Sequence, residues 1–169
     1  MEQDLEPKYR ALLSEAERHG VADMDGMRLC MNALSMAAQI ERQHAATLSP
    51  HGLSEGRFSL MFMLDAHKDG LSPHVLADQA GVARATVTGL VDGMVRDGLV
   101  ERHDNPLDRR SNLVSLTRKG RTLIRKVFGS QVEQMASAFD SLSQADRRQL
   151  GKLMGKVSSQ LVDRRAHAK

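Results

Sequence analysis

Two short stretches with helical periodicity are separated by a turn at Gly81, a pattern that leaves few folds open to the chain. Ser72 and Pro73 favour a helix over 73–79, because the serine oxygen accepts an amide proton and proline needs no amide at the first helical position. Gly81 can take the positive φ of a tight turn, and a second helix is expected over 84–96. The apolar spacing of that helix predicts a buried face formed by Val87, Leu90, Val91 and Met94.

A β-hairpin is predicted directly after this pair of helices. Gly98 ends the second helix, and residues 99–103 and 113–116 have the composition of two strands. The polar segment between them, 104–112, would form a charged tip. A helix-turn-helix followed by such a hairpin is a winged helix-turn-helix, so the predicted fold class is mainly α with a small β component.

Longer helical stretches flank this lobe. One is expected at about 25–48, and two more follow the hairpin at about 117–134 and 143–165. A further helix is predicted to begin after Ser54, with inward residues Phe58, Met61, Phe62 and Leu64. The apolar residues that keep helical register in the last helix are Leu150, Leu153, Met154, Val157 and Leu161.

Length and composition favour a folded protein in a reducing compartment. A chain of 169 residues can bury a core, and no apolar run approaches the roughly 18 residues that a membrane-spanning helix requires. The acidic amino terminus lacks the basic start and apolar stretch of a secretory signal. Cys30 is the only cysteine and has no partner for an internal disulfide. We therefore expect a cytoplasmic protein without a membrane partner.

Positive charge is concentrated in one part of the sequence. The net charge is only +3, yet residues 84–126 contain ten Lys or Arg against five Asp or Glu. This segregation suits the phosphate backbone of nucleic acid better than a uniformly charged surface would. A solvated basic face is the alternative explanation.

The helix over 84–96 and the tip of the hairpin carry the candidate DNA contacts. The residues expected to face outward at the helix start are Arg84, Ala85, Thr86 and Thr88. Arginine can bind guanine edges or phosphates, and threonine can contact thymine methyl groups, when such a helix enters the major groove. At the tip, Arg109 and Arg110 could reach a neighbouring minor groove, with Asp108 orienting one guanidinium. An exposed helix start and a solvated polar turn are the simpler alternatives.

Four segments, in this order and spacing, carry a resemblance to a known family. They are 81–88, 97–100, 108–110 and 116–120, which read GVARATVT, DGLV, DRR and LTRKG. Together they resemble the MarR family of transcription regulators, over about residues 29–161. The resemblance implies a triangular homodimer, built by interleaved terminal helices, that binds a pseudo-palindromic operator in double-stranded DNA and usually represses it.

By that similarity, the recognition-helix positions are occupied by Arg84, Thr86 and Thr88, and the wing motif by Asp108 and Arg110 with Arg109 beside them. Two residues depart from the family pattern. Ala83 stands where a capping serine is common, and Gly89 stands where a basic side chain often follows the threonine. One cap and one DNA contact are therefore expected to be missing, which would alter operator affinity or sequence preference.

The resemblance also implies a domain organisation. The DNA-binding lobe would span 53–117, and the dimerisation region would combine 25–52 with 118–169. Residues 1–24 would form an amino-terminal extension with a helix over 5–19, similar to a segment that some members pack over the dimer interface. A loose arm is the alternative.

Family members often release DNA when a small phenolic or other aromatic acid binds between the dimerising helices and the winged lobe. The candidate ligand-binding residues are Met31, Leu34, Arg57, Phe58 and Met61. Methionines, including Met27, Met36 and Met63, can line an adaptable apolar cavity, and Arg57 could pair with a carboxylate. The alternative is that these methionines belong to the core.

A thiol-based alternative depends on Cys30. Some members similar to this chain sense organic peroxides through a single cysteine near the start of the same helix, and the spacing of Cys30 from Gly52 fits that pattern. The tyrosines expected to stabilise the thiolate are replaced by His44 and Glu55, and a lone buried cysteine is usually an inert small hydrophobe. His44 would favour the thiolate only if it approached the sulfur.

Other classes of function have less support. The sequence has no phosphate-binding loop, no Gly-x-Ser-x-Gly and no ordered Cys/His/Asp set, so we expect no enzymatic activity. The seven histidines show no spacing typical of metal ligands, and neither a metal nor another cofactor is expected. A winged helix that serves only as a protein-docking module is the non-catalytic alternative, and salt dependence would separate it from DNA binding.

Overall fold

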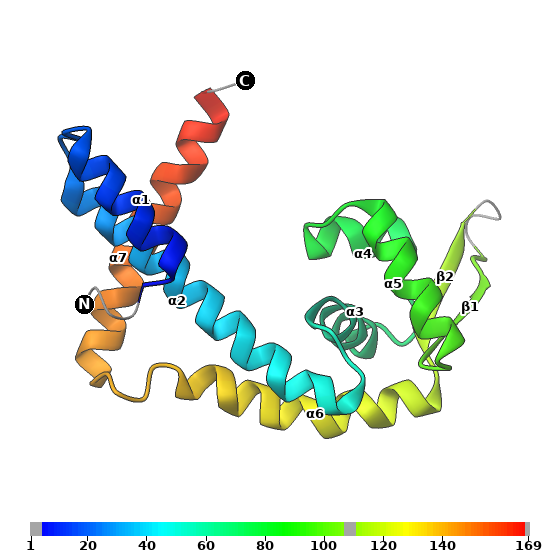
Figure 1. Ribbon diagram of the computed structural model, residues 1–169. Helices are drawn as coiled ribbons and strands as arrows, with labels where there is room; N and C mark the ends of the chain where they lie inside the picture. Colours follow the sequence, from blue (N-terminus) through cyan, green and yellow to red (C-terminus); the bar gives the residue numbers. More distant parts are fainter. Residues whose placement is uncertain (1–4, 107–110, 168–169) are drawn as a thin grey trace. The chain divides into compact units, whose positions relative to one another are not determined.

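The computed structural model describes residues 5–106 and 111–167 (Figure 1). Its elements, in chain order, are α1 (Pro7–Arg18), α2 (Met24–Leu48), the 3₁₀ turn η1 (Ser49–His51), α3 (Glu55–Ala66), α4 (Pro73–Ala80), α5 (Arg84–Arg96), β1 (Val100–Asp104), β2 (Asn112–Leu116), α6 (Arg118–Ser137) and α7 (Gln144–His167). The two strands form one antiparallel sheet. The predicted fold class, mainly α with a small hairpin, is confirmed. The chain divides into two compact units, Met1–Val132 and Glu133–Lys169.

Serine side chains begin α3 and α4, as the sequence predicts. Ser54 Oγ accepts the amide proton of Arg57 over 3.3 Å, and Ser72 Oγ accepts that of Val75 over the same distance. Gly81, with a φ of 66°, ends α4 in the left-handed conformation that the turn requires. Local contacts therefore determine where α3 begins and where α4 begins and ends.

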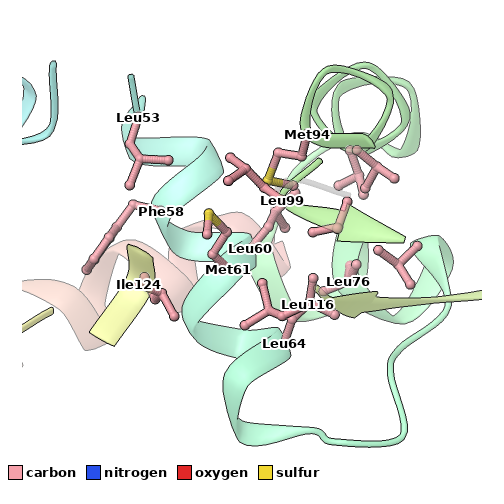
Figure 2. Close-up of a cluster of buried hydrophobic side chains, with 14 of the residues drawn as sticks. Leu53, Phe58, Leu60, Met61, Leu64, Leu76, Met94, Leu99, Leu116 and Ile124 are labelled. Carbon is pink, nitrogen blue, oxygen red and sulfur yellow. The ribbon is translucent and has the colours of Figure 1, made fainter. Parts of the chain in front are cut away.

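One apolar core holds α3, α4, α5, the hairpin and the first half of α6 together. Val87, Val91 and Met94 of α5 are fully buried in it, and Leu90 is partly buried against it. Figure 2 shows α3 at the centre of this cluster, with Met94 to one side and Ile124 of α6 to the other. The predicted buried face of α5 is therefore confirmed.

The expected inward orientation of Phe62 is wrong. Phe58, Met61 and Leu64 of α3 are buried, whereas Phe62 is 42 % exposed. One residue advances a helix by about 100°, so Phe62 lies at the edge of the face that Met61 buries. Its ring centroid lies 6.1 Å from that of Phe58.

The hairpin pairs in a regular antiparallel register. Val100 lies opposite Leu116 at the base, and Asp104 lies opposite Asn112 at the far end. Leu71, in the segment before α4, adds a third short stretch by exchanging main-chain hydrogen bonds with β2. The observed strand bounds differ from the predicted ones by one residue.

The segment 116–120 joins the hairpin to α6 through two residues with defined tasks. The Thr117 hydroxyl donates to the carbonyl oxygen of Gly98 over 2.7 Å and accepts the amide proton of Gly120 over 3.1 Å. A Cβ at Gly120 would collide with the carbonyl oxygen of Leu99. A hydroxyl at 117 and a glycine at 120 therefore let α6 start directly against the end of α5.

The amino-terminal helix α1 packs on α2 (Figure 1). An apolar cluster between the two segments consists of Leu5, Leu13 and Met31. Beside it, Arg42 Nη1 lies 2.6 Å from Glu6 Oε1, and hydrogen bonds from Arg42 and Lys8 lower the pKa of the Glu6 carboxyl. The helix predicted over 5–19 is present, and it is anchored to α2.

The second unit contains the end of α6 and the helix α7. Large apolar side chains of α7 are exposed within the chain, namely Leu153, Met154, Val157, Leu161 and Val162. This unit has no apolar core cluster among its described residues. In the described ranges of the whole chain, no helix combines the length and apolarity needed to cross a membrane.

We expect Ala83→Ser to stabilise the protein. Ala83, with φ −63° and ψ 143°, has the extended conformation of a helix cap, but its side chain accepts no amide proton from α5. A serine there would accept one, as Ser72 does for α4, and should raise the free energy of unfolding by about 1 kcal/mol. Urea denaturation followed by circular dichroism measures the change. Ala85→Ser, inside the first turn, should give no gain, and an equal gain in both variants would contradict the capping explanation.

Candidate nucleic-acid interface

The first turns of α5 present one face to solvent. Val87 and Val91 point into the core and have no exposed surface. The residues predicted to face outward are all exposed, namely Arg84, Ala85, Thr86 and Thr88. The structure therefore brings the predicted recognition residues of this helix together on one accessible face.

Polar groups on this face are few. The Thr88 hydroxyl donates to the main-chain carbonyl oxygen of Arg84 over 3.0 Å. Asp92, one turn further along, is held by Arg102 of β1, whose Nη2 lies 2.6 Å from the Asp92 Oδ1. Within residues 5–106 and 111–167, the Arg84 guanidinium has no hydrogen bond or ion pair. It is available to an anionic or hydrogen-bond-accepting group outside the chain.

The predicted wing residues Asp108, Arg109 and Arg110 lie outside the residues that the structure describes. The two strands that lead to them are described. Asn105 Nδ2 donates to Ser111 Oγ over 2.8 Å across the base of the loop. The hairpin has the predicted place in the fold, and the roles of the three charged residues stay predictions.

A charged cluster holds the C-terminal end of α5. Arg57 of α3 donates from Nη1 to Asp97 Oδ2 over 2.7 Å and to the carbonyl oxygen of Gly52 over 3.4 Å. Lys119 of α6 donates to the carbonyl oxygen of Asp97 over 2.8 Å. A cation near a helix C-terminus also complements the helix dipole. This Asp97 clamp, formed by Arg57, Asp97 and Lys119, connects α5 to two other helices.

Sequence reasoning assigned Arg57 to a ligand carboxylate and missed Asp97 as its partner. The two residues are 40 positions apart, so no local pattern links them. The available signal in the sequence was the segment 97–100, which places Asp97 directly after α5. In the structure, this aspartate connects the end of α5 to α3 through its hydrogen bond with Arg57.

The other predicted ligand-binding residues do not gather at one place within the chain. Met31 packs against α1, whereas Phe58 and Met61 belong to the core around α3. Leu34 is exposed on α2. The structure places these residues in two apolar clusters and on an exposed face, and a ligand site that they share with Arg57 stays a prediction.

A hollow of about 380 Å³ lies between α3 and α6 instead. The residues that line it are Phe62, Asp65, Ala66, Ile124, Arg125 and Phe128. The Asp65 carboxylate lies 3.8 Å from Arg125 and from Arg121, and its buried Oδ1 has no hydrogen-bond partner among the described residues. Phe128 stacks on Phe58, with 6.4 Å between ring centroids. Aromatic walls beside a loosely paired cation can accommodate an aromatic acid.

The α6 half of this hollow escaped sequence reasoning. Arg125 and Phe128 are three positions apart and therefore share one face of the helix. That spacing was the available signal, but it does not say which other helix faces the pair. Phe62, which sequence reasoning assigned to the core, supplies the opposite wall.

Cys30 is exposed on α2. His44 lies fourteen residues further along the same helix, which corresponds to about 21 Å at a rise of about 1.5 Å per residue. His44 is therefore too far away to stabilise a Cys30 thiolate within one chain. In the part of the chain that the structure describes, no group of three or more His, Cys, Asp or Glu residues is placed to hold a metal ion.

Comparison of this chain with known proteins identifies its family. A MarR family model matches residues 51–111, which include α3, α4, α5 and β1. The chain is 28 % identical over 156 residues to the HTH-type transcriptional repressor YetL of Bacillus subtilis (strain 168), covering 92 % of this chain and 93 % of YetL. It is 30 % identical over 112 residues to the uncharacterized HTH-type transcriptional regulator YhbI of the same strain, covering 66 % of this chain and 71 % of YhbI. The chain belongs to the MarR family.

A solved structure shares the winged helix fold of this MarR protein. CouR from Rhodococcus jostii RHA1, solved bound to p-coumaroyl-CoA, superposes with a TM-score of 0.65 at 21 % identity, over 76 % of this chain and 90 % of CouR. The family resemblance seen in the sequence is confirmed. This MarR protein is a transcription regulator whose helix-turn-helix is α4 and α5 and whose wing is the β1–β2 hairpin.

In this MarR protein, we expect Arg57→Met to lower the free energy of unfolding by about 1–2 kcal/mol, because it removes a hydrogen bond to the Asp97 carboxylate and one to the Gly52 carbonyl oxygen. A double-mutant cycle with Asp97→Asn should give a coupling of about 1 kcal/mol. The exposed pair Asp92–Arg102 is the matched control, with an expected coupling below about 0.5 kcal/mol. The Arg57 side chain is 24 % exposed and that of Arg102 is 39 % exposed. Equal couplings in chemical denaturation would show that the lower exposure of Arg57 adds nothing, since Asp97 and Asp92 are about equally exposed.

Proposed function

We propose that this MarR protein is a homodimeric repressor that binds a pseudo-palindromic operator in duplex DNA and releases it when a small aromatic acid binds. The start of α5 would enter the major groove, and the wing that carries Arg109 and Arg110 would reach the neighbouring minor groove. Two comparisons support the proposal: YetL is named as a transcriptional repressor, and CouR was solved with p-coumaroyl-CoA.

The observation that carries the DNA-binding proposal is the exposed face of α5. Val87 and Val91 hold the helix from the opposite side, which fixes the direction in which its other face points. A major groove about 12 Å wide admits an α-helix in this orientation. The Arg84 guanidinium, which has no partner among the described residues, lies at the helix start, where base edges and phosphates would both be within reach.

Apolar surface left exposed in the single chain supports a dimer. On α7, Val157 and Leu161 are each 58 % exposed, and Leu153 and Met154 lie on the same stripe. Exposed apolar surface of this kind is unfavourable in water unless another surface covers it. A second copy, related by two-fold symmetry, would cover the stripe and present two α5 helices to two half-sites.

The effector proposal depends on the hollow between α3 and α6. Phe62 and Phe128 offer ring faces, and the Arg125 side chain is 66 % exposed and only loosely paired with Asp65. A ligand carboxylate could therefore replace Asp65 as the partner of Arg125. A ligand that prefers a different spacing of α3 and α6 would act on α5 as well, because both helices hold Asp97.

Selection of bound sequences from random duplex DNA tests the proposal. We expect the purified protein to enrich an inverted repeat, and aromatic acids to release that DNA. Affinity should fall steeply with salt, since phosphate contacts release counterions. No enrichment by a stable dimer would favour a protein-docking winged helix instead. Peroxide-driven release that disappears in Cys30→Ser would favour the thiol alternative.

We expect Arg125→Gln to weaken the response to aromatic carboxylates by about tenfold, because it removes a charge-assisted contact, while operator affinity changes by less than about twofold. The readout is the acid concentration that gives half-maximal release of a fluorescent operator. Lys126→Gln removes a neighbouring positive charge outside the hollow and should leave the response unchanged. An equal loss in both variants would point to a general charge effect.

We expect Val157→Asp to dissociate the dimer, because a carboxylate would replace a methyl-bearing side chain at the covered stripe. The dissociation constant measured by sedimentation equilibrium should rise at least about a hundredfold, which corresponds to about 2.7 kcal/mol. Ser159→Asp places the same charge on the opposite side of α7 and should leave the dimer intact. A dimer that survives Val157→Asp would show that this stripe is not the dimer interface.

A further inference from the structure

Half of the positively charged residues in 84–126 lie on α6 rather than on the helix-turn-helix or the wing. Five of the ten Lys and Arg residues of that segment fall in 118–126, whereas its five Asp and Glu residues all precede α6. The first turn of α6 contains no acidic residue. Cations at the amino-terminal end of a helix are unfavourable, because the helix dipole is positive there. The stability of α6 therefore does not explain this charge.

Three arginines of this segment share one face of α6. Arg118, Arg121 and Arg125 are spaced by three and four positions, which places them in one row along the helix. The Arg118 guanidinium has no hydrogen bond or ion pair within the residues that the structure describes. Arg121 Nη1 and Arg125 Nε each lie 3.8 Å from an oxygen of the Asp65 carboxylate. This arginine row therefore has three positive charges and, in the described chain, Asp65 as its negative partner.

Asp65 gives neither arginine a hydrogen bond. A charge-assisted hydrogen bond from a guanidinium to an anionic oxygen is about 2.7–2.9 Å long, well below the two observed distances of 3.8 Å. The buried Oδ1 of Asp65 has no hydrogen-bond partner among the described residues. Within the same ranges Arg125 makes no hydrogen bond, and Arg121 donates to the carbonyl oxygen of Leu116 over 3.4 Å. Both guanidiniums therefore keep donors for an anion that approaches more closely.

The arginine row leads into the aromatic part of the hollow between α3 and α6. Arg125 lines the hollow together with Phe62 and Phe128. Phe128 lies one turn after Arg125 on the same side of the helix, and Arg121 lies one turn before it. A ligand with its ring at Phe62 and Phe128 would therefore direct an anionic substituent toward two guanidiniums that converge on one carboxylate.

We propose that the hollow and the arginine row bind an aromatic phosphate monoester as the effector, with its ring at Phe62 and Phe128 and its phosphate on the row. The proposal rests on the function proposed above and narrows the aromatic acid named there to a phosphate. The arginine row and Asp65 together leave two positive charges, which complement the charge of about −1.5 to −2 on a phosphate monoester at neutral pH. A carboxylate has one negative charge and two oxygens, whereas three terminal phosphate oxygens can accept from two guanidiniums at once.

Titration of the DNA-free protein with matched ligands tests the class of ligand. Phenyl phosphate and benzoate share a ring, and methyl phenyl phosphate keeps the phosphate but has only one negative charge. In isothermal titration calorimetry at about pH 8, where the monoester is a dianion, we expect phenyl phosphate to bind at least about tenfold more tightly than the other two. This factor corresponds to one further hydrogen bond between charged groups. Equal affinity for benzoate and phenyl phosphate, or equal affinity for inorganic phosphate without a ring, would overturn the proposal.

Two variants of the arginine row test the protein side in the same titration. Arg121→Gln removes one of the two converging guanidiniums and should lower the affinity for phenyl phosphate about tenfold, while the affinity for benzoate changes by less than about twofold. Arg118→Gln, at an exposed residue, should cause a smaller loss of about threefold through its charge alone. Lys126→Gln removes the same charge outside the row and is the control. A loss in Lys126→Gln equal to that in Arg118→Gln, or no loss in either arginine variant, would overturn the proposal.

Operator DNA is the other anion that these arginines could contact. Removal of a cation that contacts operator phosphates weakens binding and reduces the dependence of affinity on salt by about one counterion. We expect Arg118→Gln to bind the selected operator within about twofold of the wild type, with an unchanged salt dependence. A reduced salt dependence would overturn the proposal, because the row would then bind DNA.

The outcomes distinguish this proposal from the proposed function. Selective binding of phenyl phosphate by a protein that enriches no operator would support the phosphate site and overturn the repressor. An operator released equally well by benzoate and by phenyl phosphate would support the repressor and overturn the selection of phosphate. Release of the operator by phenyl phosphate at a concentration about tenfold lower than that of benzoate would support both.

Discussion

Burial of one face of α5 determines how this protein can meet a partner. Val87, Val91 and Met94 are packed into the core that α3, the hairpin and α6 share. A helix with one face buried along its whole length cannot turn about its axis without exposing that face. The opposite face is therefore outward by necessity, and its composition decides what the protein can bind.

The two ends of α5 are held very differently. Its start follows the glycine turn after α4, and no side chain caps it. Its end is tied to α3 through Arg57 and to α6 through Lys119, by way of Asp97. The same two helices form the walls of the hollow that contains Arg125. A ligand in the hollow and the DNA-facing helix α5 would therefore both contact α3 and α6. A change in the spacing of these two helices would reach α5 directly, without further residues to transmit it.

Local signals in the sequence predicted most of the fold because local contacts create it. Ser72 and Gly81 bound α4 through hydrogen bonds and a backbone conformation that their neighbours in sequence complete. The site was less predictable, because its geometry depends on which helices meet. Arg57 finds Asp97 across the fold, and Phe62 lies at the edge of a buried face, where periodicity gives no clear answer. The outward residues of α5 could be predicted because their orientation follows from the buried stripe.

Because no side chain caps its start, α5 is less stable in its first turn than in the rest of its length. Around Ala83 the first main-chain amides lack a side-chain acceptor, and Arg84, Ala85 and Thr86 have little packing to hold them. Segments with few buried contacts and open hydrogen bonds unfold locally at low free-energy cost. The first turn of α5 can therefore change conformation at lower cost than the packed remainder of the helix. The residues nearest to a partner can adjust to its shape, while the rest of the helix keeps its orientation.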